Sequence, residues 1–331
     1  MDSMPPPSTS SSPRLPAASR ALATNANRRT LRLNQVREFT EGMLGGDLHA
    51  KRVLSIGNGV AGVLNAAMLS VHAIGQAYAA MAKITPKHGV KQLDRLLSNV
   101  GVDLAVFFSA WVRFVLGPRM QVVVALDWTE FDKDDHSTLA AYLVTRHGRA
   151  TPLIWASHTK SDLKGNQKRW EQELLEQLHE CIDPTVSVTL LADRGFGDQK
   201  LYDFLKLYGW DYVIRFRGDI LVTNANGESK PAAEWVSANG RATIIRDARV
   251  TADRTEVPAV VLQHARGMKE AWCLATSLAT ETAKQVVTWY SKRFSIEETF
   301  RDTKDIHFGQ GLKATHIGRT DRRDRLLLLW V

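Results

Sequence analysis

Two apolar, β-branched runs, each followed directly by an aspartate, constrain the fold of this chain more than any other feature. Residues 121–126 precede Asp127, and residues 187–192 precede Asp193. Continuous runs of this kind are typical of strands that are buried on both faces of a sheet. Adjacent strands of this type bring their carboxyl ends to one edge of the sheet, so the pattern predicts that the two aspartates converge there.

The segments around these runs predict a mixed sheet flanked by helices. Alternating apolar residues indicate further strands, and segments with helical periodicity lie between the later strands. The predicted elements are strands at 137–145 and 150–158, helices at 167–182 and 199–208, and a strand at 211–216. The order β-β-β-α-β-α-β is that of a ribonuclease-H-like (retroviral-integrase-like) core, an α/β fold.

Composition and periodicity divide the rest of the chain into further segments. A Ser/Pro-rich start predicts disorder, apolar residues at three- and four-residue spacing predict helices, and short β-like pieces between Gly and Asn turns predict an insertion. The segments are a disordered leader at 1–27, a helical domain at 28–115, the first part of the core at 116–216, a β insertion at 217–270, the completion of the core at 271–312 and a basic C-terminal segment at 313–331.

The two end regions carry many cations. The helical domain is either a DNA-binding module, helix-turn-helix-like at most, or a packing and dimerisation domain. The basic C-terminal segment is of a kind that commonly tracks phosphates. The chain stops inside the apolar run 326–331 without a helix cap or polar tail, and we therefore expect a truncated sequence.

The overall charge favours a polyanionic partner. A net charge of +8 and a pI near 9.5 point to DNA or RNA before membrane. The apolar run 59–82 is interrupted by polar residues, which predicts a buried helix and no membrane span. Cys181 and Cys273 have neither metal-binding nor disulfide spacing. With no secretory signal visible, a cytoplasmic protein is expected.

A long helix predicted over 282–305 places four chemically distinct side chains on one face, at about 100° per residue. They are Tyr290, Arg293, Glu297 and Lys304. The cations and the phenol suit phosphate oxygens and the carboxylate suits a divalent metal ion, so the set indicates phosphoryl transfer on a nucleic acid. The alternative is a solvated, salt-bridged helix face.

Glu297 would complete a set of three carboxylates with Asp127 and Asp193. Three such groups can hold two Mg²⁺ or Mn²⁺ ions about 3.5–4 Å apart, which activates an attacking oxygen and stabilises a leaving one. Each aspartate alone is more typical of a cap or a turn. It is the combination of all three that predicts a metal site.

Three motifs resemble the signature boxes of DDE insertion-sequence transposases. They are Asp127-Trp-Thr-x-Phe131, Ala192-Asp-Arg-Gly-Phe-Gly-Asp198 and Tyr290-x₂-Arg293-x₃-Glu297-x₆-Lys304. The Y-R-E-K spacing of the third box is similar to that of the insertion-sequence-four (IS4-like) family. The resemblance runs from about residue 121 to residue 304, and the spacing selects Glu297 over its neighbour Glu298.

The resemblance implies cut-and-paste transposition. One site would nick an element end, form and reopen a hairpin, and join the 3′-hydroxyl to target DNA. The implied partners are double-stranded terminal inverted repeats and target DNA, bound by a homodimer in a bacterial, nucleoid-associated setting. The implied roles are metal binding by Asp127, Asp193 and Glu297, and contacts to DNA phosphates by Tyr290, Arg293 and Lys304.

Two further residues receive roles from the resemblance. Trp272, on the strand after the β insertion, would stack on a base flipped out of the duplex; the alternative is a core tryptophan. Arg194, next to a metal carboxylate, would touch the flipped or terminal nucleotide; the alternative is a structural ion pair.

Two other functions fit the same motifs. One is a ribonuclease-H-like nuclease without strand transfer. The other is a truncated, catalytically weak relative that binds element ends and acts as an inhibitor. Which inverted repeat is bound does not follow from the sequence, because base readout depends on a few side chains in a groove.

Overall fold

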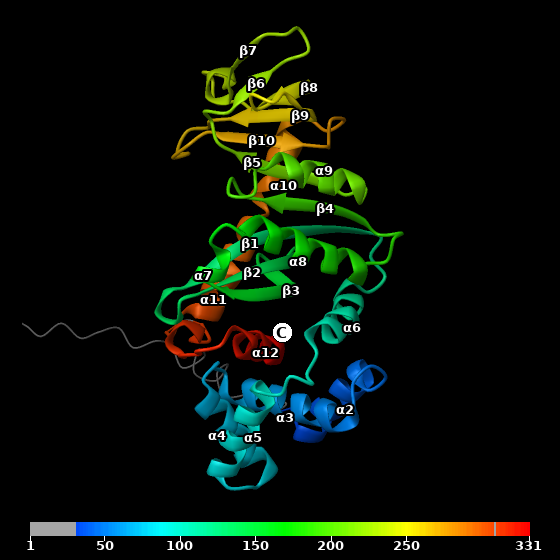
Figure 1. The fold of residues 1–331 in the computed structure, drawn as a ribbon, viewed down its shortest axis with the longest axis vertical. Helices are drawn as coiled ribbons and strands as arrows, with labels where there is room; N and C mark the ends of the chain where they lie inside the picture. Colours follow the sequence, from blue (N-terminus) through cyan, green and yellow to red (C-terminus); the bar gives the residue numbers. More distant parts are fainter. Residues whose placement is uncertain (1–30, 308) are drawn as a thin grey trace, which may run out of the picture. The chain divides into compact units, whose positions relative to one another are not determined.

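The computed structural model describes residues 31–307 and 309–331. The leader expected at 1–27 therefore lies outside the described residues. Residues Leu33–Val331 form one compact unit, in which a mixed sheet is flanked by helices (Figure 1).

The first strands of the sheet have the predicted order. They are β1 (Gln121–Phe131), β2 (His136–Val144), β3 (Ala150–Thr159), β4 (Ser187–Ala192) and β5 (Asp211–Phe216). The first three form an antiparallel meander, whereas β4 pairs in parallel with both β1 and β5. The mixed sheet expected from the two apolar runs is confirmed. The two runs pair in parallel, and parallel strands that are buried on both faces need side chains that are apolar throughout.

Strand β1 is longer than the expected strand. Its parallel register with β4 ends at the pair Leu126–Ala192, but its antiparallel pairing with β2 continues through Asp127 as far as Phe131. The prediction that the strand ends at Asp127 is therefore wrong. Because Asp127 and Asp193 each directly follow the last parallel pair, they still start from the same edge of the sheet.

The segment 217–270 extends this sheet. Its strands are β6 (Leu221–Thr223), β7 (Ser229–Pro231), β8 (Thr243–Val250) and β9 (Thr255–Gln263), and β10 (Trp272–Thr276) follows. Strand β10 lies between β5 and β9 and is antiparallel to both. The strand order within the described residues is β3-β2-β1-β4-β5-β10-β9-β8-β6-β7.

Helices cover both faces of the sheet (Figure 1). They include α7 (Lys160–Leu163), α8 (Gln167–Cys181), α9 (Gln199–Leu207), α10 (Ala283–Ser291) and α11 (Phe294–Lys304). Leu190 and Ile214 belong to the same buried cluster as side chains from α8 and α9. Their neighbours Leu191 and Val213 cluster with Val286 of α10. Alternate residues of one strand thus face opposite helical layers.

The helix predicted over 282–305 is two helices, α10 and α11, and the prediction of one continuous helix is wrong. At the break, the backbone N–H groups of Lys292 and Arg293 bond to the carbonyls of Trp289 and Tyr290. This i→i−3 pattern is a 3₁₀-type turn. Residues on either side of Arg293 therefore do not share one helical face.

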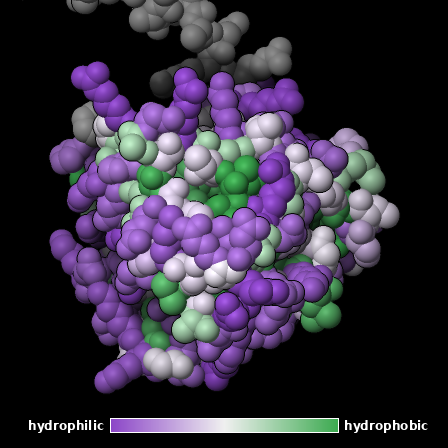
Figure 2. Space-filling model, turned by 90° about the horizontal axis from the view of Figure 1, so that it is seen from above, coloured by the Kyte–Doolittle hydropathy of each residue, from purple (hydrophilic) through white to green (hydrophobic). Residues whose placement is uncertain are grey.

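A helical region precedes the sheet. Its helices are α2 (Leu33–Leu44), α3 (Ala50–Ala66), α4 (Val71–Ala82), α5 (Pro86–Leu97) and α6 (Leu104–Leu116). In the described part of the chain no single helix is long and apolar enough to cross a membrane, and only α3 and α4 together, bent by 101°, meet that criterion. The face shown in Figure 2 is mainly hydrophilic, with small hydrophobic areas.

Helix α12 (Thr320–Trp330) packs into the interior with its own arginines. Arg323 is fully buried, and its Nη2 donates to Asp134 Oδ2 at 2.5 Å. Arg325 is 7% exposed and donates to the carbonyl of Leu97 at 3.0 Å. The expectation that the whole basic segment tracks phosphates is wrong for these two residues, because a leucine-rich helix turns them towards internal acceptors.

The buried carboxyl of Asp324 gives the docking of α12 a pH dependence. Burial raises the pKa of this group to about 7, although Ser157 donates to it and Arg323 lies near it. A carboxyl whose folded pKa exceeds its unfolded value binds more protons when folded, so stability falls as the pH rises from about 4 to about 7. We expect Asp324→Asn to remove this part of the fall and to raise the free energy of unfolding at pH 8 by roughly 1–3 kcal/mol. Urea unfolding of both proteins at pH 5 and pH 8 measures it; an equal pH dependence would contradict it.

Helices α4 and α5 meet at two glycines, and this contact predicts a sharp substitution effect. A Cβ on Gly89 would lie 2.3 Å from the carbonyl oxygen of Gly75 and 2.8 Å from Cβ of Ala79. We expect Gly89→Ala to destabilise this contact by roughly 1–3 kcal/mol and to speed hydrogen exchange in α4 and α5. Gly46→Ala, with open space around the new Cβ, is the control and should leave exchange unchanged. Equal exchange in the two variants would refute the packing argument.

Candidate active site

The first aspartate of the site is held by its own strand. Asp127 Oδ1 accepts the backbone N–H of Trp128 at 2.9 Å, and its side chain is 18% exposed. The second aspartate shapes the turn after β4: Asp193 Oδ1 accepts the N–H of Gly195 at 2.8 Å, as in an Asx-turn. Both carboxylates come from the edge where the parallel pairing of β1 and β4 stops.

The third carboxylate reaches this edge through an arginine. Arg293 Nη1 donates to Asp127 Oδ2 at 3.0 Å, and Arg293 Nη2 donates to Glu297 Oε1 at 2.5 Å. Arg293 stands at the N-terminus of α11, one turn before Glu297. The break between the two helices thus places a 3% exposed guanidinium between a strand carboxylate and a helix carboxylate.

The electrostatics show that the three carboxylates influence one another. Burial raises the pKa of Asp127 to about 6, Arg293 opposes the rise, and the charges of Asp193 and Glu297 add to it. No group of His, Cys, Asp or Glu side chains within the described ranges is arranged, as it stands, to hold a metal ion. The three side chains nevertheless all offer carboxylate oxygens, which Mg²⁺ prefers as ligands. Two of them, Asp127 and Glu297, already bond to the same positive group, the guanidinium of Arg293.

Of the other two residues of the predicted helical face, Tyr290 is buried and Lys304 is partly buried. Tyr290 is 1% exposed and packs edge-on against Trp272, with ring centroids 4.8 Å apart. Lys304 is partly buried over the ring of Phe131, at 5.1 Å from its centroid. Burial, followed by the charge of Lys313, lowers the pKa of Lys304. The solvated helix face considered from the sequence is therefore wrong for Tyr290 and Arg293.

Trp272 and Arg194 have partners of different kinds. Trp272 is half-buried and stacks on Phe294 at 6.1 Å, so one aromatic pair lies beside the break between α10 and α11. Arg194 donates to Glu270 Oε2 at 2.8 Å, the ion pair considered as its alternative role. Glu270 also accepts from Arg215 at 2.9 Å.

Arg215, Arg217 and Glu270 were not among the site residues predicted from the sequence. They line a cavity of about 730 Å³ together with Arg194, and Arg215 Nε is buried without a hydrogen-bond partner. A signal for the two arginines was present, because they lie at the end of the predicted strand 211–216, as Asp193 lies at the end of the strand before it. Glu270 lies in the loop between β9 and β10, where no strand or helix pattern indicates a functional residue.

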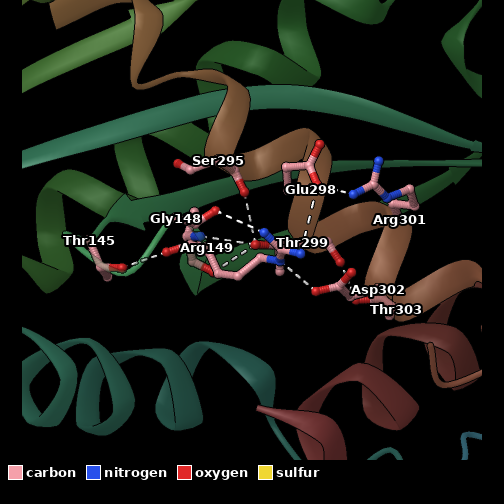
Figure 3. A network of polar contacts seen from close by, with 10 residues as sticks. Thr145, Gly148, Arg149, Ser295, Glu298, Thr299, Arg301, Asp302 and Thr303 are labelled. Atoms are coloured by element: carbon pink, nitrogen blue, oxygen red, sulfur yellow. Dashed lines mark hydrogen bonds and ion pairs between the residues drawn. The ribbon is translucent and has the colours of Figure 1, made fainter. Parts of the chain in front are cut away.

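A separate set of contacts anchors α11 to the turn between β2 and β3 (Figure 3). Thr299 Oγ1 accepts the backbone N–H of Ala150 at 2.9 Å and lies within donating distance of the Ala150 carbonyl, at 3.1 Å. Arg149 Nε donates to Asp302 at 2.5 Å. Glu298 pairs with Arg149 and Arg301 in this network. Glu298 therefore takes part in anchoring the helix that carries Glu297.

The Thr299 hydroxyl predicts a measurable contribution to this anchoring. Thr299→Val keeps the side-chain shape but leaves the buried N–H of Ala150 unpaired, so we expect a loss of roughly 1–3 kcal/mol in the free energy of unfolding. Thr303 offers a matched control, since the partner of its buried hydroxyl among the described residues is the carbonyl of Thr299 in its own helix. Thr303→Val should change stability by no more than about 0.5 kcal/mol. Denaturant unfolding compares the two, and equal losses would contradict the assignment.

Comparisons with known proteins identify the family of the chain. No curated protein matches the chain. Among solved structures, the X-ray crystal structure of Marinitoga piezophila Argonaute in complex with 5′ OH guide RNA is similar at 9% identity and a TM-score of 0.25; the match covers 73% of this chain and 38% of that one, and it supports no functional argument. The family model described as "Transposase DDE domain" matches residues 119–330, from before β1 to the end of α12. The chain therefore belongs to the family of transposase DDE domains.

Proposed function

We propose that this chain is a cut-and-paste DNA transposase and that Asp127, Asp193 and Glu297 form its catalytic centre. The observation that supports this most directly is the convergence of the three carboxylates. The parallel register places the two aspartates at one edge of the sheet, and Arg293 joins Asp127 to Glu297. The spacing of Tyr290 and Lys304 around them supports placement in the IS4-like family.

We assign to the three carboxylates the binding of two Mg²⁺ or Mn²⁺ ions. Such ions, when bound, activate an attacking oxygen and stabilise a leaving oxygen in phosphoryl transfer. Asp193 is oriented for this by the N–H of Gly195, and Asp127 by the N–H of Trp128. Arg293, whose guanidinium already bonds to carboxylate oxygens, has the fork geometry that also suits a phosphate.

The proposed substrate is double-stranded DNA, first as the terminal inverted repeats of the element and then as the target. In the proposed sequence, an end is nicked, the freed 3′-hydroxyl forms a hairpin, the hairpin is reopened, and the 3′-hydroxyl is joined to target DNA. The stacked pair of half-buried Trp272 and exposed Phe294 supports the hairpin step, because an aromatic face can receive a base that leaves the stack. Work on two ends calls for a homodimer in the DNA complex, and DNA as substrate suits a nucleoid-associated protein of the bacterial cytoplasm.

An asparagine substitution tests the catalytic assignment. We expect Asp193→Asn to lower the rate of end cleavage with Mg²⁺ by at least about 10³-fold, since one oxygen ligand becomes a neutral amide. Asp198→Asn is the matched control: Asp198 caps α9 through the N–H of Lys200, and asparagine caps a helix equally well. Nick, hairpin and joined products are resolved on a denaturing gel. Unchanged cleavage by Asp193→Asn would sink the proposal.

Pre-cleaved ends separate the transposase from its two alternatives. Joining of pre-cleaved ends to target DNA is expected of the transposase. Cleavage of intact ends without any joining would identify a nuclease. Binding of the ends without cleavage or joining would identify an inhibitor.

A further inference from the structure

The two aspartates of the candidate site are each oriented by a neighbouring backbone N–H. The N–H of Trp128 bonds to Asp127 Oδ1 at 2.9 Å, and the N–H of Gly195 bonds to Asp193 Oδ1 at 2.8 Å. The parallel register of β1 and β4 ends directly before the two aspartates. The positions of Trp128 and Gly195, which lie beyond this register, therefore determine how the two carboxylates stand towards each other.

An ion pair on α8 joins these two segments. Glu171 Oε1 accepts the indole N–H of Trp128 at 3.0 Å, and Glu171 Oε2 accepts from Lys168 Nζ at 2.9 Å. Lys168 Nζ also donates to the carbonyl of Gly195 at 2.8 Å. A chain of three hydrogen bonds thus runs from the residue that orients the first aspartate to the residue that orients the second. We call Lys168 and Glu171 the α8 bridge.

The carboxylate of the α8 bridge is withdrawn from water. Glu171 is 4% exposed, and Gln167 Nε2 donates a further hydrogen bond to it at 2.9 Å. The remaining buried residues of α8 are Leu174, Leu175, Leu178 and Cys181. A carboxylate among them has a desolvation penalty that an apolar side chain would not have. Packing of α8 on the sheet alone therefore does not account for Glu171.

The cation of the α8 bridge lies against the turn that follows β4. Besides its bond to Gly195, Lys168 Nζ lies 5.7 Å from the ring centroid of Phe196, which is buried. The side chain of Lys168 is 46% exposed, so it can be replaced without opening the core. The next residue, Arg169, pairs at 3.2 Å with Glu173 of its own helix and reaches neither segment.

We propose that the α8 bridge is a positioning element that sets the spacing of Asp127 and Asp193 before any metal ion binds. Two carboxylates at one sheet edge repel each other until a cation lies between them. Hydrogen bonds that hold the flanking residues oppose this repulsion and keep the oxygen ligands oriented. The inference rests on the proposed function, because it assigns the binding of divalent metal ions to the two aspartates. Lys168 and Glu171 act through Gly195 and Trp128 and touch no reacting atom.

The proposal is tested by metal binding in the absence of DNA. Electron paramagnetic resonance measures the affinity of the full chain for Mn²⁺. Lys168→Met and Glu171→Gln should each weaken Mn²⁺ binding by roughly tenfold or more, since each breaks the link between the two segments. Lys168→Arg should bind Mn²⁺ as the parent does, because a guanidinium has enough donors for both acceptors. No DNA is present, so a contact between Lys168 and DNA cannot account for a loss.

Two further measurements distinguish positioning from a general loss of structure. In end cleavage, Lys168→Met should raise the half-saturating Mg²⁺ concentration by a similar factor of roughly ten, while the rate at saturating Mg²⁺ stays near that of the parent. Without metal, backbone hydrogen exchange in the turn 193–198 should be faster in Lys168→Met than in the parent. Circular dichroism should show all variants folded.

Arg169→Met is the matched control. It removes one cation from the adjacent position of the same helix, and it breaks an exposed ion pair with Glu173. The net charge changes as in Lys168→Met, but the α8 bridge stays intact. Mn²⁺ affinity and exchange in the turn 193–198 should therefore equal those of the parent.

Two outcomes would overturn the proposal. One is parental Mn²⁺ affinity in both Lys168→Met and Glu171→Gln. The other is an equal loss in Arg169→Met, which would leave only an effect of net charge. A chain that needs the α8 bridge to bind Mn²⁺ but cleaves no DNA would instead contradict the proposed function and leave the bridge standing.

Discussion

The guanidinium of Arg293 is bonded to Asp127 on a strand and to Glu297 on a helix, and it is almost completely withdrawn from solvent. Burying a cation and a carboxylate costs several kcal/mol per ion unless each finds its partner. Breaking one side of such a pair leaves the other charge buried and alone. This constraint fixes where α11 stands against β1, and with it the position of the third carboxylate.

The rest of the structure keeps this contact in place. The 3₁₀-type turn at Lys292 and Arg293 re-aims the chain after α10, and Thr299 pins α11 to the start of β3 from a different side. At the other end of the family domain, Arg323 and Arg325 join α12 to the turn between β1 and β2 and to α5. Within the segment that matches the transposase DDE domain, buried arginines thus join elements that are distant in sequence.

Some features were predictable because their cause is local. Apolar runs such as 187–192 predict buried strands by composition alone, and the two aspartates that follow such runs come directly after the last parallel pair of β1 and β4. The burial of Tyr290 and Arg323 was not predictable, because a helical wheel does not show which face meets the core. The Arg215 and Glu270 contact joins residues from a strand and a loop, and no periodicity links them.

The sequence by itself determined the mixed sheet, the order of its first five strands along the chain, and the position of Asp127 and Asp193 directly after apolar runs, because these follow from composition and strand periodicity. The spacing of the third motif also named Glu297. Only the tertiary structure decided that the helix breaks at Arg293, that this arginine bridges two carboxylates, and that Arg323 and Arg325 of α12 point inwards. The physical reason is that a charged side chain takes its role from the partners that packing brings within hydrogen-bond distance, and those partners lie far away in the sequence.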